Sequence, residues 1–377
     1  MNILLNKYTI ISTLPPGMET SMSRTLLDFV FKPNSIAIAG VSPDMSTPNM
    51  AQRYATSLVD FGFKGKIYPV HPSGGQLHGM EIYKNIKDIP GPVDLVVAAI
   101  PAKFTPQLIE DSDLVNARAV QLFTSGYSEI EDEIGKILEN EILSIARKKG
   151  IRLIGPNCMG MYNPVGGLTF ATQYPDQTGF PQTPGPVGLI SQSGGNCIFC
   201  IRDAFSRNLF FSKAISYGNA ADLNESDYLE YLADDPDTSI ILMYLEGIKD
   251  GERFLKALKK AVSKKPVVIN KAGNTESGAR TCASHTSAIA GKAYIWRDLI
   301  KQVGAIQVSS MSELVDMALV FTRLKAPGGK NVALFGTGGG IAVQAADEIT
   351  GAGLKIPLLH DDIRKEMKTV YGSEAGG

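Results

Sequence analysis

One histidine stands within a run of small and polar residues at positions 271–291. His285 is flanked by hydroxyl residues, namely Ser284, Thr286 and Ser287. Hydroxyls and free backbone N–H groups around an imidazole suit a histidine that carries or meets a phosphate group. An apolar strand is expected just before the run and a helical pattern follows it, so the run itself is predicted to be a loop. A surface histidine in an ordinary loop is the alternative interpretation.

A carboxylate lies at the end of the preceding predicted strand. Glu246 follows the apolar segment 240–245, where an acid is costly unless it is paired or solvated. If Glu246 faces the loop of the next strand, its carboxylate can fix one imidazole nitrogen of His285. It would then support positive charge while the other nitrogen takes a phosphoryl group. A solvated acid at a strand end is the alternative.

A third segment has the composition of an anion site. The expected strand 187–191 ends in a turn rich in serine and glycine that opens a helix. Successive N–H groups, hydroxyls and the helix dipole would point at one spot, which suits phosphate. The candidate phosphate-binding residues are Ser191, Ser193, Gly194 and Gly195. A tight glycine turn that binds no ligand is the alternative.

Apolar strands alternate with amphipathic helices over the first half of the chain. Strands are expected at 35–39, 66–70, 94–100, 119–123 and 152–154, with helices at about 50–61, from about 106, and at 130–149. This alternation predicts a parallel sheet covered on both faces, and such sheets bind ligands at the carboxyl ends of their strands. The candidate ligand-binding residues there are Gly40, Val41, Ser42, His71, Ser73, Ile100, Pro101, Ser125, Asn157 and Cys158.

The first turn argues against a nicotinamide dinucleotide. That ligand predicts Gly-x-Gly-x-x-Gly after the first strand and an acid after the second. Here the first turn reads Gly40-Val41-Ser42-Pro43-Asp44, and the second strand ends in Val70-His71-Pro72 without a carboxylate. A phosphate-bearing nucleotide that does not need this acid stays open, whereas an NAD-dependent oxidoreductase is disfavoured.

Two further α/β units follow. After a Gly/Pro-rich stretch, strands are expected at 187–191, 211–216, 239–245 and 266–270, closed by a helix at 310–324. Another strand is expected at 331–335, before a glycine-rich turn, a helix to about residue 350 and a possible strand at 354–359. Cys197 and Cys200 are interpreted as buried thiols on a helix, because no second ligand pair has zinc spacing.

Composition limits the class of protein. The chain has 377 residues, 44% of them hydrophobic and 20% charged, with a net charge of −1. This predicts two or three domains and gives no indication of nucleic acid or an acidic membrane as a partner. Four cysteines do not form a disulfide framework, and no apolar run approaches the length of a membrane span. Residues 1–17 make a poor signal peptide, so a cytoplasmic protein is expected.

Together these segments resemble the α subunit of ADP-forming acyl-CoA (acetyl-CoA) synthetases, in the succinyl-CoA synthetase superfamily. The resemblance covers roughly residues 26–375 and rests on the order and spacing of six segments: Pro33-Asn34-Ser35-Ile36-Ala37, Tyr68-Pro69-Val70-His71-Pro72, Gly155-Pro156-Asn157-Cys158-Met159-Gly160, Ser191-Gln192-Ser193-Gly194-Gly195, Leu245-Glu246-Gly247 and Ala283-Ser284-His285-Thr286-Ser287. It implies an α/β chain with an N-terminal extension (1–25), a Rossmann-like CoA-binding domain (26–160), a linker (161–185), a flavodoxin-like domain (186–325) and part of a third α/β domain (326–377).

The resemblance also implies roles. CoA would bind the ten residues at the first strand ends, phosphate would bind the helix at Ser193, and Glu246 would support a phosphorylated His285. The implied reaction is acyl-CoA + ADP + phosphate ⇌ carboxylic acid + CoA + ATP. ADP or ATP with Mg²⁺ would be held by an ATP-grasp β subunit or fused half, with no metal site on this chain. An oligomer is expected.

Two departures from the family pattern stand in the first domain. Residues 46–49 replace a turn that usually has more glycine, and Ser73 stands where many members have a lysine. Both changes weaken the case for tight binding of the CoA nucleotide. The alternative function is therefore a non-catalytic CoA-binding or sensing module.

Overall fold

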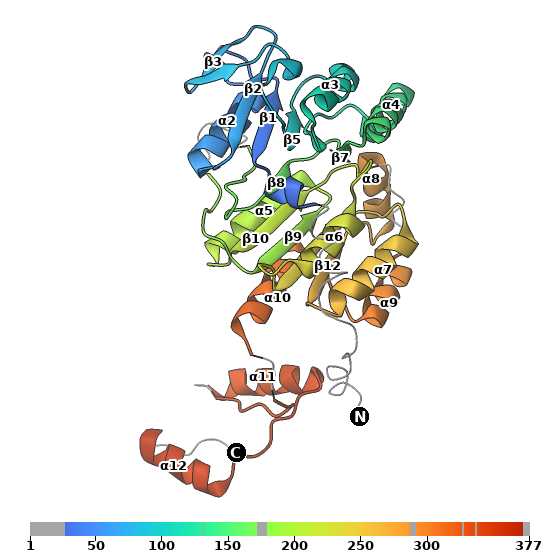
Figure 1. Cartoon of the computed structure of the whole chain (residues 1–377). Coiled ribbons are helices and arrows are strands. Elements are labelled where there is room, and N and C mark those ends of the chain that lie inside the picture. Colours follow the sequence, from blue (N-terminus) through green and yellow to red (C-terminus); the bar gives the residue numbers. More distant parts are fainter. Residues whose placement is uncertain are drawn as a thin grey trace, which may run out of the picture. The chain divides into compact units, whose positions relative to one another are not determined.

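The computed structural model describes residues 27–130, 132–171, 179–286, 292–325, 328–335 and 338–371, with backbone alone at 283–286 and 371. The chain divides into two compact units, Met1–Arg323 and Leu324–Gly377. Each unit is described by itself below (Figure 1).

The first sheet is wholly parallel, as its apolar strands predict. Its strands lie in the order β2 (Lys66–Val70), β1 (Ser35–Ala39), β5 (Leu95–Ala98), β6 (Ala119–Leu122) and β7 (Arg152–Ile154). Side chains of β1 are buried on both faces, because α2 (Met50–Phe61) covers one face and α3 (Thr105–Ser112) and α4 (Glu133–Lys149) cover the other. A small hairpin of β3 (Gly75–Leu77) and β4 (Met80–Ile82) follows β2.

The second sheet is mixed. Its order is β13 (Ile306–Val308), β12 (Val267–Lys271), β11 (Ile240–Leu245), β9 (Val187–Ser191), β10 (Phe211–Ser216) and β8 (Gly160–Tyr162), with β8 alone antiparallel. Alternate strand residues face opposite sides, so α5 (Gly194–Ser206) and α10 (Met311–Arg323) pack on one face. The other face carries α6 (Glu225–Asp234), α7 (Gly251–Val262) and α9 (Ala293–Val303). Cys197 and Cys200 are buried on α5, as expected.

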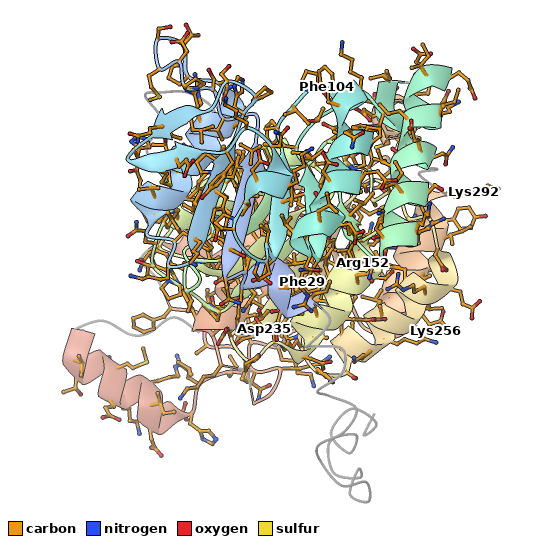
Figure 2. The ribbon with its side chains drawn as sticks, turned by 45° about the horizontal axis from the view of Figure 1, so that its top comes forward. Phe29, Phe104, Arg152, Asp235, Lys256 and Lys292 are labelled. Atoms are coloured by element: carbon orange, nitrogen blue, oxygen red, sulfur yellow. The ribbon has the colours of Figure 1, made fainter. Side chains whose placement is uncertain are left out.

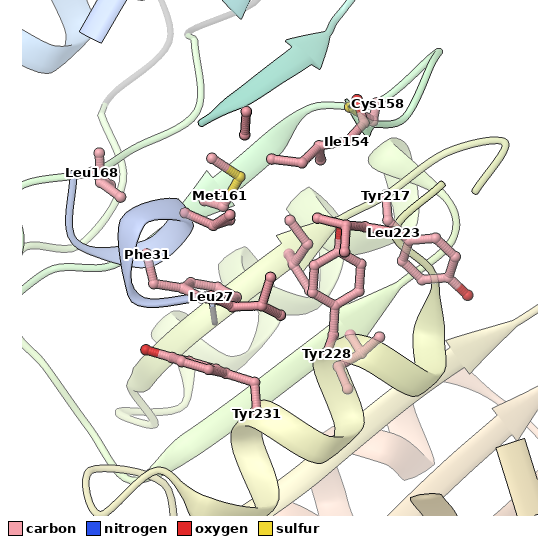
Figure 3. Packing of buried hydrophobic residues seen from close by; sticks show 14 of the residues in the cluster. Leu27, Phe31, Ile154, Cys158, Met161, Leu168, Tyr217, Leu223, Tyr228 and Tyr231 are labelled. Carbon is pink, nitrogen blue, oxygen red and sulfur yellow. Dashed lines mark hydrogen bonds between the residues drawn. The ribbon is translucent and has the colours of Figure 1, made fainter. Parts of the chain in front are cut away.

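The two sheets share one core. The segment before β1 crosses to the second sheet, where Phe31 stacks on Tyr231 of α6 with ring centroids 4.6 Å apart (Figure 3). Arg152 on β7, labelled in Figure 2, forms a paired hydrogen bond with Asp222 beyond β10, at 2.8 and 3.0 Å. Strand β8 spans the predicted boundary between the first domain (26–160) and the linker (161–185), and it joins the second sheet directly. The relative position of the two sheets is therefore fixed by packing.

The predicted loop at 271–291 is wrong over part of its length. Helix α8 spans Glu276–Thr286. Thr275 caps it by accepting the N–H of Gly278, and Arg280 pairs with Glu276 one turn away at 2.7 Å. Such a cap and an i,i+4 pair support a helix even where small residues dominate the sequence.

The second unit holds fewer strands than predicted. Helices α11 (Gly339–Gly351) and α12 (Asp361–Tyr371) are present, but the strands expected at 331–335 and 354–359 are wrong. A single parallel bridge joins Asn331 to Lys355. None of the described side chains in this unit is buried, so the apolar residues of the expected strands have no neighbouring layer to pack against.

Candidate active site

A cavity of about 310 Å³ lies between the two sheets, at the carboxyl ends of their strands. Its walls come from the segments that follow β6, β7, β9 and β10. The lining residues are Phe123, Ser125, Asn157, Cys158, Met159, Gln192, Ser193, Gly194, Gly195, Gly218 and Asn219. Parallel strands present their functional residues at this edge, so the cavity joins the two binding edges predicted from the sequence.

Six of the candidate residues line this cavity together: Ser125, Asn157, Cys158, Ser193, Gly194 and Gly195. Gly40, Val41, Ser42, His71, Ser73, Ile100 and Pro101 follow β1, β2 and β5 and lie outside the cavity lining. Ser191 is buried at the end of β9, and its hydroxyl donates to the carbonyl of Ser193 at 2.7 Å. The structure thus splits the candidates between the cavity and the other ends of the first sheet.

Helix α5 begins at the cavity wall. Ser193 caps it by accepting the N–H of Asn196 at 3.3 Å. Within the described chain, the N–H groups of Gly194 and Gly195 donate to no protein acceptor. Unpaired donors at a helix start, together with the helix dipole, can bind an anion.

Glu246 is not among the residues that line the cavity, but it bonds the side chain of Gln192, which is. The side-chain oxygen Oε1 of Gln192 accepts the N–H groups of Glu246 at 2.8 Å and Gly247 at 3.2 Å. Tyr244 donates its hydroxyl to Oε1 of Glu246 at 3.2 Å. The Glu246 side chain is buried, so it is not the solvated strand-end acid that the sequence left open.

Buried ionisable groups connect Glu246 with α8. The ammonium of Lys271 donates to the Glu246 carbonyl at 2.7 Å and to the Ala272 carbonyl at 2.5 Å. Burial lowers the pKa of Lys271, and burial together with the charge of Glu246 raises the pKa of Cys282 on α8. The charge of Glu246 therefore acts on a side chain of α8.

His285 lies three residues beyond Cys282 in α8. Its backbone belongs to the helix, whereas its side chain lies outside the described residues. The contact predicted between the imidazole and Glu246 therefore stays a prediction.

Asn219 closes the cavity toward the first sheet. Its amide nitrogen donates to Glu129 at 2.5 Å and to Glu139 at 3.3 Å. Glu139 also accepts the hydroxyl of Ser128 at 2.7 Å. The short helix η4 (Ser128–Ile130) packs against α8, so the first sheet, the second sheet and α8 meet at this wall.

The turn after β1 is built from side chains. Gly40 has a φ of +106°, and a Cβ there would lie 2.4 Å from the Ala99 carbonyl oxygen, so only glycine fits. Asn49 donates to the Gly40 carbonyl at 2.8 Å, and Gln52 donates to the Ser42 carbonyl at 2.7 Å. These bonds organise the segment 42–49 without the additional glycines of the family pattern.

A second hollow of about 410 Å³ lies between α2 and residues of two described segments, 169–170 and 179–182. Its lining includes Arg53, Thr56 and His78. None of the candidate ligand-binding residues lines it, and the chemistry suggested by the sequence does not extend to it.

Five cavity residues were not among the candidates: Phe123, Met159, Gln192, Gly218 and Asn219. Gln192 and Met159 stand within recognised segments, but a glutamine and an apolar residue carry no signal of ligand binding by type. Gly218 and Asn219 follow β10 of the second sheet, and they line the cavity together with residues that follow β7 of the first sheet.

Among the described helices, none is long and apolar enough to cross a membrane.

Comparison with known proteins points to one enzyme family. Residues 34–164 match a CoA binding domain, and residues 184–321 match a succinyl-CoA ligase like flavodoxin domain. The α subunit of acetate–CoA ligase (ADP-forming) II from Pyrococcus furiosus is 38% identical over 346 residues, which are 91% of this chain and 73% of that subunit. The 4-hydroxybutyrate–CoA ligase (ADP-forming) of Nitrosopumilus maritimus is 33% identical over 90% of this chain and 48% of its own length.

A solved structure agrees in fold. The dinucleotide forming acetyl-coenzyme A synthetase 1 of Candidatus Korarchaeum cryptofilum, in complex with phosphate and ADP, gives a TM-score of 0.81 at 32% identity. The match covers 91% of this chain and 72% of that one. Sequence, fold and the meeting of two strand-end sites at one cavity agree, and the chain belongs to the family of ADP-forming acyl-CoA synthetase (acetate–CoA ligase) α subunits.

Proposed function

We propose that this chain, with an ATP-grasp partner, interconverts acyl-CoA + ADP + phosphate and a carboxylic acid + CoA + ATP. The observation that carries the proposal is the cavity between the two sheets, with the open start of α5 in its wall. A CoA thioester brought by the first sheet and a phosphate held by the second would meet there.

The chemistry has three steps. A phosphate oxygen attacks the thioester carbonyl, the C–S bond breaks, and the CoA thiolate takes a proton. His285 then attacks the phosphorus of the acyl phosphate, so a P–N bond forms while the carboxylate leaves. Finally a β-phosphate oxygen of ADP attacks the phosphohistidine and forms ATP. Each step exchanges one activated bond for another, so the protein acts mainly by positioning and by charge stabilisation.

Several features support these roles. The free N–H groups of Gly194 and Gly195 can hold the phosphate, and Ser193 keeps the helix start in place. Glu246 is buried, anchored through Gln192 and coupled to α8, which suits a carboxylate that supports a positively charged imidazole.

Cysteine is not proposed as a nucleophile in this cavity. The thiol of Cys158 donates to the carbonyls of Leu122 and Ile154, at 3.5 and 3.6 Å. Burial raises the pKa of Cys158 to about 12, which leaves little thiolate at neutral pH.

We assign CoA to the first sheet. Ser125, Asn157 and Cys158 would face its thiol end in the cavity, and the remaining candidates after β1, β2 and β5 would line the path of the nucleotide. The proposed domains are an extension (1–25), the CoA-binding part (26–160), a linker (161–185), the phosphohistidine part (186–325) and a partial third domain (326–377). We place Mg²⁺ with ADP or ATP in the partner, and we propose an oligomeric, cytoplasmic assembly that uses a small carboxylic acid.

The experiment is labelling with γ-³²P-ATP in the presence of an ATP-grasp β subunit. We expect an acid-labile, base-stable phosphoryl group on this chain, a lability that belongs to phosphohistidine and not to phosphoserine. His285→Ala should abolish it, and Ser284→Ala serves as the matched control on a hydroxyl neighbour. Addition of CoA and the acid should discharge the label.

The alternative, a CoA-binding or sensing module, predicts a different pattern. Such a module would bind CoA but would take no label beside a partner that is active with another α chain. Equal labelling of His285→Ala and the parent chain would also refute the proposal.

A further inference from the structure

Met159 lies directly over the start of α5. A Cβ placed on Gly194 would lie 2.7 Å from Cγ and 3.7 Å from Sδ of Met159, so the thioether side chain covers the first residue of the helix. Both residues line the cavity. The side chain of Met159 thus occupies the space beside the proposed phosphate.

The backbone of Met159 is fixed although its side chain is flexible by nature. Its N–H donates to the hydroxyl of Ser216 at 3.2 Å, and its carbonyl accepts the amide of Gln121 at 3.2 Å. Ser216 ends β10 of the second sheet and Gln121 belongs to β6 of the first. Met159 is therefore held between the two sheets, and a substitution of its side chain leaves both bonds available.

The attack of phosphate on the thioester restricts where the acyl group can lie. When phosphate at α5 attacks the thioester, the acyl carbon is within one covalent bond of a phosphate oxygen. Its alkyl or aryl part must then lie against the cavity wall within a few ångströms of Gly194. The apolar side chains of that wall are Phe123 and Met159, which belong to one hydrophobic cluster. The thiol of Cys158 instead points to the carbonyls of Leu122 and Ile154.

We propose that Met159 sets the size limit of the acyl group, by occupying the space next to Gly194 into which a bulkier acyl chain would extend. The inference rests on the proposed function and adds a specificity-determining residue to it. Phe123 provides the facing apolar surface. A small acyl group fits beside the thioether of Met159, whereas a branched or aromatic acyl group would clash with it.

The test compares acids of increasing size in the direction that consumes ATP. The parent chain and Met159→Ala, each with the β subunit, are assayed for kcat/KM with acetate, 2-methylpropanoate and benzoate. We expect the ratio of benzoate to acetate to rise about tenfold or more in Met159→Ala, in line with pocket discrimination of a few methylene groups. Met159→Leu, which keeps the volume, should retain the ratio of the parent chain.

Labelling of the chain by ATP provides the independent readout, because that half-reaction involves no acyl group. Met159→Ala should label like the parent chain, which also shows that it is folded. Met159→Val gives a smaller reduction in volume should the alanine variant prove unstable, and its ratio should rise less. Normal labelling with an unchanged ratio in both variants would overturn the role of Met159. Absence of label in the parent chain would instead refute the proposed function.

Discussion

Strands β1 and β9, one in each sheet, lead through a turn into a helix, and the two turns differ in how many side-chain bonds hold them. Between β1 and α2, the long segment 40–49 is tied down by Asn49 and Gln52, whose side chains accept each other's backbone N–H groups in a capping box. Between β9 and α5, only Gln192 and Ser193 intervene, and Ser193 accepts the single N–H of Asn196.

The difference shows that the same strand–turn–helix arrangement can serve two purposes. At α2 side chains bond the N–H groups of Asn49 and Gln52 and the carbonyls of Gly40 and Ser42, which supports the segment after β1. At α5 the donors of Gly194 and Gly195 stay available at a cavity. The side-chain bonds of the turn at α2 and the cavity beside α5, and not topology, therefore distinguish a support from a proposed anion site.

The largest effect is expected at a third helix start, α6, where a carboxylate is buried without sufficient compensation. Burial raises the pKa of Glu225 to about 7, above its ordinary value of 4.5. Below pH 4.5 the group is neutral in both states and contributes nothing. As the pH rises from 4.5 to 7, the unfolded state ionises first, so the folded state loses up to about 3 kcal/mol.

Glu225→Gln removes this titration. The variant should match the parent chain near pH 4.5 and be more stable by up to about 3 kcal/mol near pH 8. Urea denaturation at the two pH values measures the difference. Glu252→Gln, on the exposed first turn of α7, is the matched control and should keep the pH dependence of the parent chain, because Glu225 is intact. Parallel stability curves for Glu225→Gln and the parent chain would contradict the interpretation.

The next effect is expected at Glu246, which Gln192 ties to the start of α5. Glu246→Gln keeps the volume but removes the charge that would support an imidazolium at His285. Loss of a charge-assisted contact worth about 1.5–3 kcal/mol should slow labelling by roughly one to two orders of magnitude. Tyr244→Phe removes the hydroxyl that bonds Glu246 but leaves the carboxylate in place, so it should slow labelling less. Rapid-quench measurement of label against time separates the two, and equal rates in Glu246→Gln and the parent chain would exclude the role.

The two glycines of α5 offer a sharper contrast. Gly194→Ala places a Cβ against Met159, whereas the nearest atom to a Cβ on Gly195 is the Ser193 hydroxyl at 4.0 Å. Overpacking beside the phosphate should lower kcat/KM for phosphate about tenfold in Gly194→Ala. Gly195→Ala, which adds the same methyl group to open space, should lose much less. Similar losses in both would mean that the helix start itself tolerates no side chain and that Met159 is irrelevant.

These contrasts also show what the sequence alone could reveal. Ser193, Gly194 and Asn157 could be predicted as binding residues because their types suit close approach to a ligand. The strands before them were recognisable from continuous apolar runs. Met159 and Asn219 gave no such signal, because their importance comes from the meeting of two sheets that are far apart in sequence. The sequence predicted a loop in place of helix α8, because small residues dominate this segment. The structure shows that a cap at Thr275 and an ion pair between Glu276 and Arg280 support the helix.

The smallest effect is expected at the start of α2. Asn49→Ala removes the cap of α2 and the bond to the Gly40 carbonyl, so it should destabilise the chain by about 1 kcal/mol. Asn224→Ala removes the equivalent cap of α6 and should cost a similar amount. Only the first lies beside Ser42, so only Asn49→Ala should weaken CoA binding measured by calorimetry, while labelling of the chain by ATP stays unchanged. Equal CoA affinity in both variants would mean that the turn after β1 supports the fold and takes no part in holding the nucleotide.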